Sequence, residues 1–340
     1  MKLSPRSFLA RTDIRLGITL GDPAGIGPEV MIGAANRLAN PSVIPVLIGR
    51  LSVVNRLYGD LSAAYESVDA AGCTPADFKA GSRYIAAVAG DWVEPAPGIG
   101  TVATGSESKA YIDAGIDLWR RGIIDALVTG PVNKGFIEKT GCRFTGHTEY
   151  IASSIGEVAP RMLMFSRDYR VLLVTTHMPL AAVSGAVTVD GILAAIRAGR
   201  EAIASIDERE PRIAVAGLDP HCGDDGAIGE FDVKVTAEAV RIARSEGIDI
   251  EGPMAADTLF LPDRWRRYEL VIAQYHDQGL IPFKMLAFDT GVNITIGLSI
   301  TRTSPDHGTA YDIAGRRIAA DGSALEAMNV ACLLAARKRR

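Results

Sequence analysis

The sequence is poor in the features that mark secreted, nucleic-acid-binding and membrane proteins. It has four widely spaced cysteines in 340 residues, which argues against a disulfide framework and favours a reducing compartment. Its formal net charge is −4, without the basic excess that is typical of nucleic-acid binders. Segment 1–13 lacks the apolar core of a signal peptide, and the uncharged run 171–189 contains polar residues and a proline. We therefore expect a cytoplasmic protein that binds neither nucleic acid nor membranes.

What is present is the composition of a globular protein. The chain is 48% hydrophobic and 22% charged, which excludes an intrinsically disordered chain, and its length suggests two domains. Short apolar segments alternate with longer helical patterns, which favours an α/β fold with largely parallel sheets flanked by helices. The predicted strands are 15–20, 44–48, 125–129, 170–175, 212–216, 270–274 and 292–296. The predicted helices are 28–38, 109–121, 189–206, 233–246 and 324–337.

All five histidines lie in segments rich in glycine, threonine, aspartate or proline. His177 and His276 each follow an apolar strand, and ligand sites in open α/β sheets gather at the carboxyl ends of strands. Three histidines with Asp257, Asp277 or Asp306 nearby would suit a divalent metal that keeps open positions for substrate. No two histidines have a local metal-binding spacing, so this hypothesis requires the fold to bring them together. The alternative is turn histidines that hydrogen-bond to backbone carbonyls.

Two further patterns favour an anionic ligand. Glycines at positions 21, 25 and 27 precede a predicted helix that begins at Pro28, and a helix N-terminus attracts anions. Their spacing is neither the dinucleotide-binding nor the Walker pattern, and a tight turn without a ligand is the alternative. Lys284, Asn293 and Arg302 follow His276 at near-regular intervals and would suit a phosphate or carboxylate. Otherwise these charged residues are solvated at the surface.

The ordered motifs of the chain resemble those of the 4-hydroxythreonine-4-phosphate dehydrogenase (PdxA) family, NAD-dependent enzymes of the pyridoxal phosphate pathway. Segment 307–315 also resembles the cofactor loop of isopropylmalate dehydrogenases. The chain departs from the family's usual residues at Gly130 and around His221, where Asp219, Cys222 and Asp224 replace asparagine, alanine and glutamate. We interpret Cys222 as filling space rather than changing the choice of metal. The matching motifs are 21–29, 129–134, 144–149, 175–177, 217–221, 256–260, 275–279, 292–295 and 302–309.

The resemblance implies the two-domain isocitrate/isopropylmalate dehydrogenase-like fold and a homodimer with a shared active site. We expect one α/β domain from 1–131 plus 300–340, a second from 132–299, and the active site in the cleft between them. The implied metal ligands are His177, His221 and His276, shared between the two subunits. The implied substrate-binding residues are His147, Thr148, Lys284, Asn293 and Arg302. The expected cofactor-binding residues are Gly25, Gly27, His307, Gly308, Thr309 and Asp312.

The activity that the resemblance implies is a metal-dependent oxidation and decarboxylation of a phosphorylated β-hydroxy acid. The favoured reaction converts 4-(phosphooxy)-L-threonine to 3-amino-2-oxopropyl phosphate, with NAD as the cofactor, NADP as its alternative, and Zn, Mg, Co or Mn as the metal. Paralogues acting on 4-phospho-D-threonate or 4-phospho-D-erythronate are the main alternative. Aromatic dihydrodiol carboxylate dehydrogenases fit less well, because they lack the motif that is intact at 146–149.

Three points remain open at this stage. The proton acceptor is Asp277, Asp257 or Lys134, in that order of preference. A hydrolase or lyase without a nicotinamide cofactor is one rival class. A non-catalytic sensor of a metal or a phosphorylated ligand is the other, and the presence of the metal and substrate residues together argues against it.

Overall fold

The computed structural model describes residues 13–62, 64–158 and 160–339. The chain forms two compact units, the first from the described residues of 1–159 and 298–340, and the second from 160–297. We expected the first domain change near residue 131. The first unit continues instead through α4 (Lys134–Glu138) and α5 (His147–Ile155), because both helices contact α3 (Val102–Arg120).

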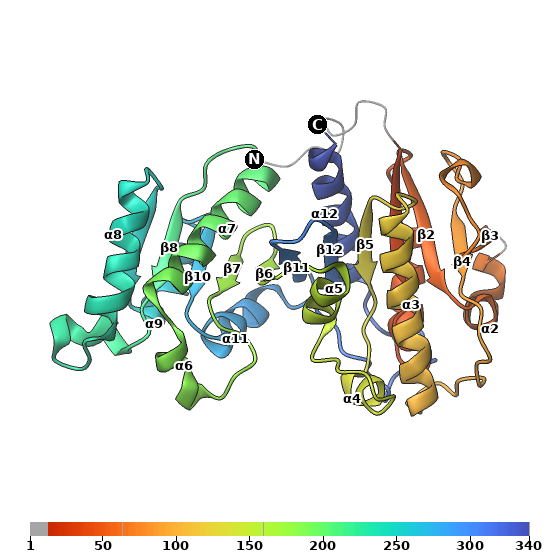
Figure 1. Cartoon of the computed structure of the whole chain (residues 1–340), viewed down its shortest axis with the longest axis horizontal. Coiled ribbons are helices and arrows are strands. Elements are labelled where there is room, and N and C mark those ends of the chain that lie inside the picture. The colour runs from red at the N-terminus through yellow and green to blue at the C-terminus, as the bar shows by residue number, and fades with distance from the viewer. Residues whose placement is uncertain (1–12, 63, 159, 340) are drawn as a thin grey trace. The chain divides into compact units, whose positions relative to one another are not determined.

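The first unit is a parallel sheet flanked by helices (Figure 1). Its strands run in the order β3-β4-β2-β1-β5-β12, and all five neighbouring pairs are parallel. The strands are β1 (Ile14–Thr19), β2 (Val43–Gly49), β3 (Glu66–Asp69), β4 (Tyr84–Ala87), β5 (Ala126–Thr129) and β12 (Thr301–Pro305). Besides α3, α4 and α5, the helices are α1 (Gly27–Asn36), α2 (Leu51–Ser62), the short η2 (Pro75–Asp77) and α12 (Gly322–Lys338).

Helices α3 and α12 cover opposite faces of this sheet. Leu127 of β5 packs against Gly115 of α3, where a Cβ would lie 2.8 Å from the leucine side chain. Thr303 of β12 donates a hydrogen bond to the Ala327 carbonyl of α12. Leu127 pairs with Arg302, and successive side chains on a strand point to opposite faces. Arg302 therefore points toward the face that α3 covers.

The second unit is a mixed sheet in the order β11-β6-β7-β10-β8-β9. Strand β6 is antiparallel to both β11 and β7, and the other neighbouring pairs are parallel. The strands are β6 (Arg161–Phe165), β7 (Arg170–Leu173), β8 (Ile213–Ala216), β9 (Ile250–Met254), β10 (Leu270–Ala273) and β11 (Val292–Ile296). The helices are α6 (Leu180–Ala186), α7 (Val189–Asp207), η3 (Pro220–Gly226), η4 (Asp232–Thr236), α8 (Ala237–Ser245), α9 (Ala256–Leu259), α10 (Pro262–Trp265) and α11 (His276–Ala287).

The α/β fold with largely parallel strands and flanking helices is confirmed. Among the described residues, no single helix is long and apolar enough to cross a membrane. Helices α6 and α7 satisfy length and composition only when taken together, and they are bent by 90° at their junction.

Candidate functional site

The first unit contains a buried cationic cluster around Arg302, a residue that is only 2% exposed. The Arg302 guanidinium donates to the Thr129 hydroxyl at 2.6 and 3.1 Å and to the Thr148 hydroxyl at 3.5 Å. Burial lowers the pKa of Arg302 to about 10, and the nearby Glu149 carboxylate partly offsets that decrease. Arg302 is therefore still charged near neutral pH, in a place where a positive charge is poorly solvated.

His147, the first residue of α5, belongs to the same cluster. Its Nε2 atom is buried and has no hydrogen-bond partner among the described residues. Burial lowers the pKa of His147 well below its ordinary value, and the charges of Arg302 and Lys134 lower it further. The imidazole is thus neutral near pH 7, and an anion could accept a hydrogen bond from a protonated Nε2.

Lys134, in the first turn of α4, is the third cationic or imidazole side chain of this cluster. A Cβ on Gly146 would lie 3.6 Å from Lys134 Nζ and 2.8 Å from the Glu149 carboxylate, so both groups meet there. The structure thus brings together four of the predicted residues, Arg302, His147, Thr148 and Lys134. Their charges favour an anion, with Glu149 as an opposing carboxylate.

The predicted cofactor residues lie on two loops that contact each other. Ile26 N donates to the Thr309 carbonyl at 2.9 Å, and a Cβ on Gly25 would lie 2.7 Å from the same oxygen. Gly25 therefore has no room for a side chain, and Gly27 begins α1. Gly308 and Asp312 are exposed, and His307 is half-buried. The N-terminus of the ten-residue helix α1 thus lies beside the 307–312 loop.

In the second unit, His177 and His276 lie together. His177 follows β7 and His276 begins α11 after the neighbouring strand β10, and their ring centroids are 5.5 Å apart. His276 Nδ1 is hydrogen-bonded to Asp277 at 2.7 Å, which leaves Nε2 available as a ligand. This donor set fits two ligands of a divalent metal.

His221 follows β8 in an unusual left-handed turn. The five residues 221–225 all have positive φ, between 46° and 80°, and only Gly223 among them is a glycine. Left-handed backbone costs about 1–2 kcal/mol per non-glycine residue. The buried Asp232 carboxylate holds the start of this segment, since it accepts from Leu218 N at 2.9 Å and Asp219 N at 2.8 Å.

The described residues of one chain contain no group of three or more histidine, cysteine or acidic side chains that could hold a metal ion. His221 therefore does not join His177 and His276 within this chain. Burial, Asp232 and Asp257 raise the pKa of the Cys222 thiol to about 11, so it is a neutral thiol. Its sulfur lies 2.8 Å from where a Cβ on Gly217 would be, so it fills space there.

The remaining predicted substrate residues also belong to the second unit. Lys284 is half-buried on α11. Asn293 on β11 contacts the Met162 sulfur at 3.3 Å through its amide nitrogen, and its buried Oδ1 has no partner among the described residues. Asn293 is thus a polar group that a ligand would satisfy.

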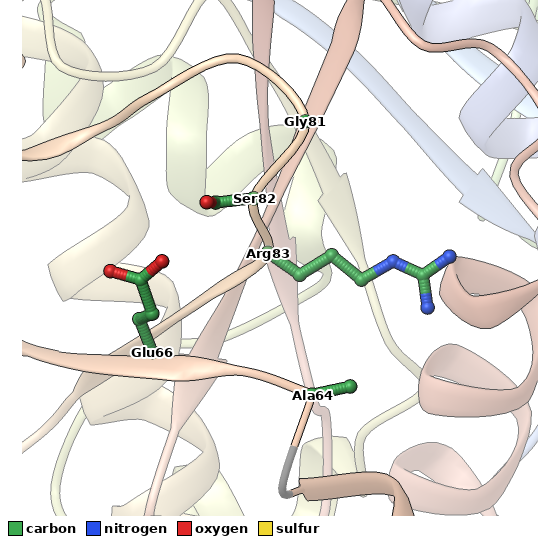
Figure 2. Close-up of a pocket in the computed structure, with 5 residues that line it drawn as sticks. All are labelled: Ala64, Glu66, Gly81, Ser82 and Arg83. Atoms are coloured by element: carbon green, nitrogen blue, oxygen red, sulfur yellow. The ribbon is translucent and has the colours of Figure 1, made fainter.

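Sequence reasoning missed Thr129, Asp232 and Tyr311, which hold predicted residues in place. Thr129 lies in a motif that was recognised, but nothing in its local pattern indicates a contact with Arg302, 173 positions away. A pocket of about 420 Å³ at the β3–β4 edge contains none of the predicted residues. In Figure 2, Arg83 and Glu66 of that pocket point in opposite directions, and Arg83 binds Asn36 of α1 at 2.7 Å.

Together, the buried cationic cluster, the two contacting loops and the strand-end histidines indicate an α/β protein that binds a small anionic ligand. The chain belongs to the PdxA family. Residues 42–331 match the family model described as pyridoxal phosphate biosynthetic protein PdxA. The resemblance that the motifs indicated is thereby confirmed.

Individual relatives agree with this assignment. A 4-hydroxythreonine-4-phosphate dehydrogenase of Desulforapulum autotrophicum is 42% identical over 94% of this chain and 95% of its own length. The crystal structure of a 4-hydroxythreonine-4-phosphate dehydrogenase from Klebsiella pneumoniae superimposes with a TM-score of 0.78 at 31% identity, covering 96% of this chain and 99% of that one. A terephthalate 1,2-cis-dihydrodiol dehydrogenase from Burkholderia xenovorans is more distant, with a TM-score of 0.65, 26% identity, and coverage of 94% and 98%.

Proposed function

We propose that this protein is an NAD-dependent dehydrogenase that oxidises and decarboxylates 4-(phosphooxy)-L-threonine to 3-amino-2-oxopropyl phosphate. The observation that carries the proposal is the buried cationic cluster of Arg302, His147 and Lys134. An anion there would accept hydrogen bonds from Arg302 and from the unpartnered His147 Nε2. A phosphate is the substrate group that matches this combination of charge and donors.

His177, His221 and His276 would hold the proposed metal, which would supply Lewis-acid polarisation of the substrate hydroxyl, and a bound nicotinamide would supply the hydride acceptor. The chain's own residues bind and orient the substrate. Arg302, His147 and Thr148 would bind its phosphate, and Lys284 and Asn293 are the further residues proposed to bind the substrate. Asp277 fixes the orientation and tautomer of His276 through the 2.7 Å hydrogen bond.

Three residues were proposed as the proton acceptor, and their surroundings differ. Asp277 is already engaged with His276, which favours a positioning role. Asp257 is the second residue of α9 and lies close enough to raise the Cys222 pKa. Lys134 lies beside the Glu149 carboxylate in the cationic cluster. We place Asp257 first, because it is neither hydrogen-bonded to a histidine of the proposed metal site nor part of the cationic cluster.

A substrate panel tests the proposed function. Purified protein with divalent metal and NAD⁺ is given 4-(phosphooxy)-L-threonine, 4-phospho-D-threonate, 4-phospho-D-erythronate and the terephthalate dihydrodiol, and NADH and CO₂ are both measured. NADH and CO₂ in equal amounts from the first compound support the proposal. Preference for another phosphorylated acid corrects the substrate, and turnover without NAD⁺ reduction contradicts the reaction class. Replacing NAD⁺ by NADP⁺ decides the cofactor preference.

We also propose that the protein works in the cytoplasm as a homodimer with a shared active site. Three exposed apolar residues lie at helical spacing along α11 and just beyond its end: Ile281 is 58% exposed, Met285 80% and Phe288 55%. A contiguous exposed apolar stripe is typical of an interaction surface. Because α11 also carries His276 and Lys284, a second copy on this stripe would lie beside the metal-binding residues. That arrangement would let the partner subunit supply the third metal ligand, His221, which one chain does not bring beside His177 and His276.

Met285→Glu is expected to convert the dimer to monomers and to lower activity at least tenfold, because a buried unpaired charge costs several kcal/mol. Val158→Glu is the matched control, since Val158 is 86% exposed and lies in the first unit. Sedimentation velocity and NADH formation are measured on both variants. A dimeric Met285→Glu protein would rule out this stripe as the interface, and a monomeric, active wild type would rule out the dimer.

Subunit mixing tests the shared site. His221→Ala and His276→Ala proteins are each inactive on this proposal. If the two histidines of a site come from different chains, mixed dimers contain one intact site, and random exchange restores roughly a quarter of wild-type activity. Each variant taken alone through the same exchange is the control. No recovery despite confirmed subunit exchange would show that both histidines act within one chain.

A further inference from the structure

Tyr311 lies where the two cofactor-type loops of the first unit meet. Its hydroxyl donates to Asp22 Oδ2 at 2.7 Å and also hydrogen-bonds the side chains of Thr309 and Asn133. A phenol has one proton to donate and lone pairs to accept with, so these three partners use the hydroxyl fully. Burial and the Asp22 carboxylate raise the pKa of Tyr311, so the hydroxyl remains protonated near pH 7.

Each partner belongs to a different part of the candidate site. Asp22 lies in the glycine loop before α1, Thr309 in the 307–312 loop, and Asn133 in the segment that leads to Lys134. Asn133 Oδ1 caps α4 by accepting from Phe136 N at 3.1 Å, so its amide nitrogen is the atom that faces Tyr311. One hydroxyl therefore connects both loops to Asn133, which directly precedes Lys134 of the cationic cluster.

The surroundings of the hydroxyl leave little freedom for another arrangement. A Cβ on Gly100 would lie 2.4 Å from the Tyr311 oxygen, so only glycine fits there. Gly98 N donates to the Ala24 carbonyl at 2.8 Å, which adds a third segment to the same assembly. Asp22 is fully buried, with Ala24 N at 2.9 Å on its other oxygen. Loss of the Tyr311 hydroxyl would leave the buried carboxylate without one of its closest donors.

We propose that Tyr311 is a positioning residue for the nicotinamide dinucleotide, whose hydroxyl fixes the glycine loop and the 307–312 loop in their binding arrangement. The inference rests on the proposed function, because it takes these loops to be the cofactor site. Tyr311 acts through the two loops, and its side chain need not touch the cofactor. The expected effect is therefore on cofactor affinity rather than on the chemical step.

The test is Tyr311→Phe, which removes one oxygen atom and retains the ring. Tyr268→Phe is the matched control, because the Tyr268 hydroxyl also donates to a carboxylate, Glu251, at 2.7 Å, but in the second unit. Titration calorimetry gives the Kd for NAD⁺ of the metal-loaded proteins, steady-state kinetics give KM and kcat, and thermal unfolding checks the fold. We expect the Kd and KM for NAD⁺ to rise about tenfold in Tyr311→Phe, equivalent to about 1.4 kcal/mol. We expect kcat at saturating NAD⁺ to stay within about twofold of wild type.

Four outcomes decide the matter. A selective loss of NAD⁺ affinity in Tyr311→Phe, with Tyr268→Phe like wild type, supports the inference. Unchanged NAD⁺ affinity in Tyr311→Phe overturns it, and so does an equal loss in both variants, which would indicate general loosening. If the wild type binds the phosphorylated substrate but no nicotinamide dinucleotide, the proposed function itself fails, and that result is separate from the other three.

Discussion

Exhaustive chelation is expected to abolish NADH formation, and restoring a divalent metal should recover it. The reason is that the proposed chemistry requires the substrate hydroxyl to lose its proton near neutral pH, which a bound divalent metal promotes. His221→Ala should weaken metal binding at least tenfold, and Asp277→Asn by about ten- to a hundredfold, because it removes the group that orients His276. Metal content and calorimetric metal affinity are measured directly, independently of activity. Restoration with Zn²⁺, Mg²⁺, Co²⁺ and Mn²⁺ in turn identifies the metal.

His147→Ala provides the matched control for this experiment. His147 belongs to the first unit and lies near the charges of Arg302 and Lys134. Its removal should therefore leave metal affinity unchanged and impair only the binding of the phosphorylated substrate. Full activity of a protein shown to contain no metal would contradict the metal proposal. Equal loss of metal from the His147→Ala and His221→Ala proteins would show that the effect is not specific to the strand-end histidines.

The sequence predicted best those elements whose stability comes from local pattern. The strand 292–296 was predicted with the bounds that β11 has, and helix 189–206 differs from α7 by one residue at its end. In α7 the apolar residues share one face, and the Thr188 side chain accepts from Gly191 N at the N-terminus. Apolar periodicity and helix capping both depend on residues that are close together in the sequence, so a single sequence is enough to predict them.

The elements that carry the site were harder to predict. Strand β12 has the sequence Thr-Arg-Thr-Ser-Pro, yet all five residues are buried. The Arg302 guanidinium finds partners on β5 and α5, and the Thr303 hydroxyl finds one on α12. No apolar run marks such a strand. Helix α11 contains Gly279 and Pro282, which normally argue against a helix, and the left-handed turn at 221–225 depends on Asp232 from a later segment. The family motifs identified these residues, whereas only the fold indicates what holds them.

Arg302→Ala is expected to lower kcat/KM for the 4-phosphorylated substrate by about one to two powers of ten. Charge-assisted hydrogen bonds contribute about 1.5–3 kcal/mol each, and 1.36 kcal/mol corresponds to tenfold in rate. The loss on the unphosphorylated analogue should be far smaller, since that compound lacks the group Arg302 is proposed to bind. Lys284→Ala should show the same selectivity if its ammonium also contacts the anionic groups. Arg302→Lys retains the charge but lacks the fork that reaches Thr129 and Thr148, so we expect it to recover only part of the loss.

A buried arginine can also matter for folding alone, and Arg170→Ala separates the two explanations. Arg170 is another buried strand arginine, paired with Asp207, and it belongs to the second unit. Its loss should reduce thermal stability and affect both substrates alike, because no phosphate contact is removed. The ratio of kcat/KM between phosphorylated and unphosphorylated substrates is therefore the quantity that isolates phosphate recognition. If this ratio is the same in Arg302→Ala and wild type, Arg302 supports the fold and the phosphate lies elsewhere. If the wild type prefers the unphosphorylated analogue, the phosphate proposal fails, and a dihydrodiol or another unphosphorylated acid becomes the leading substrate.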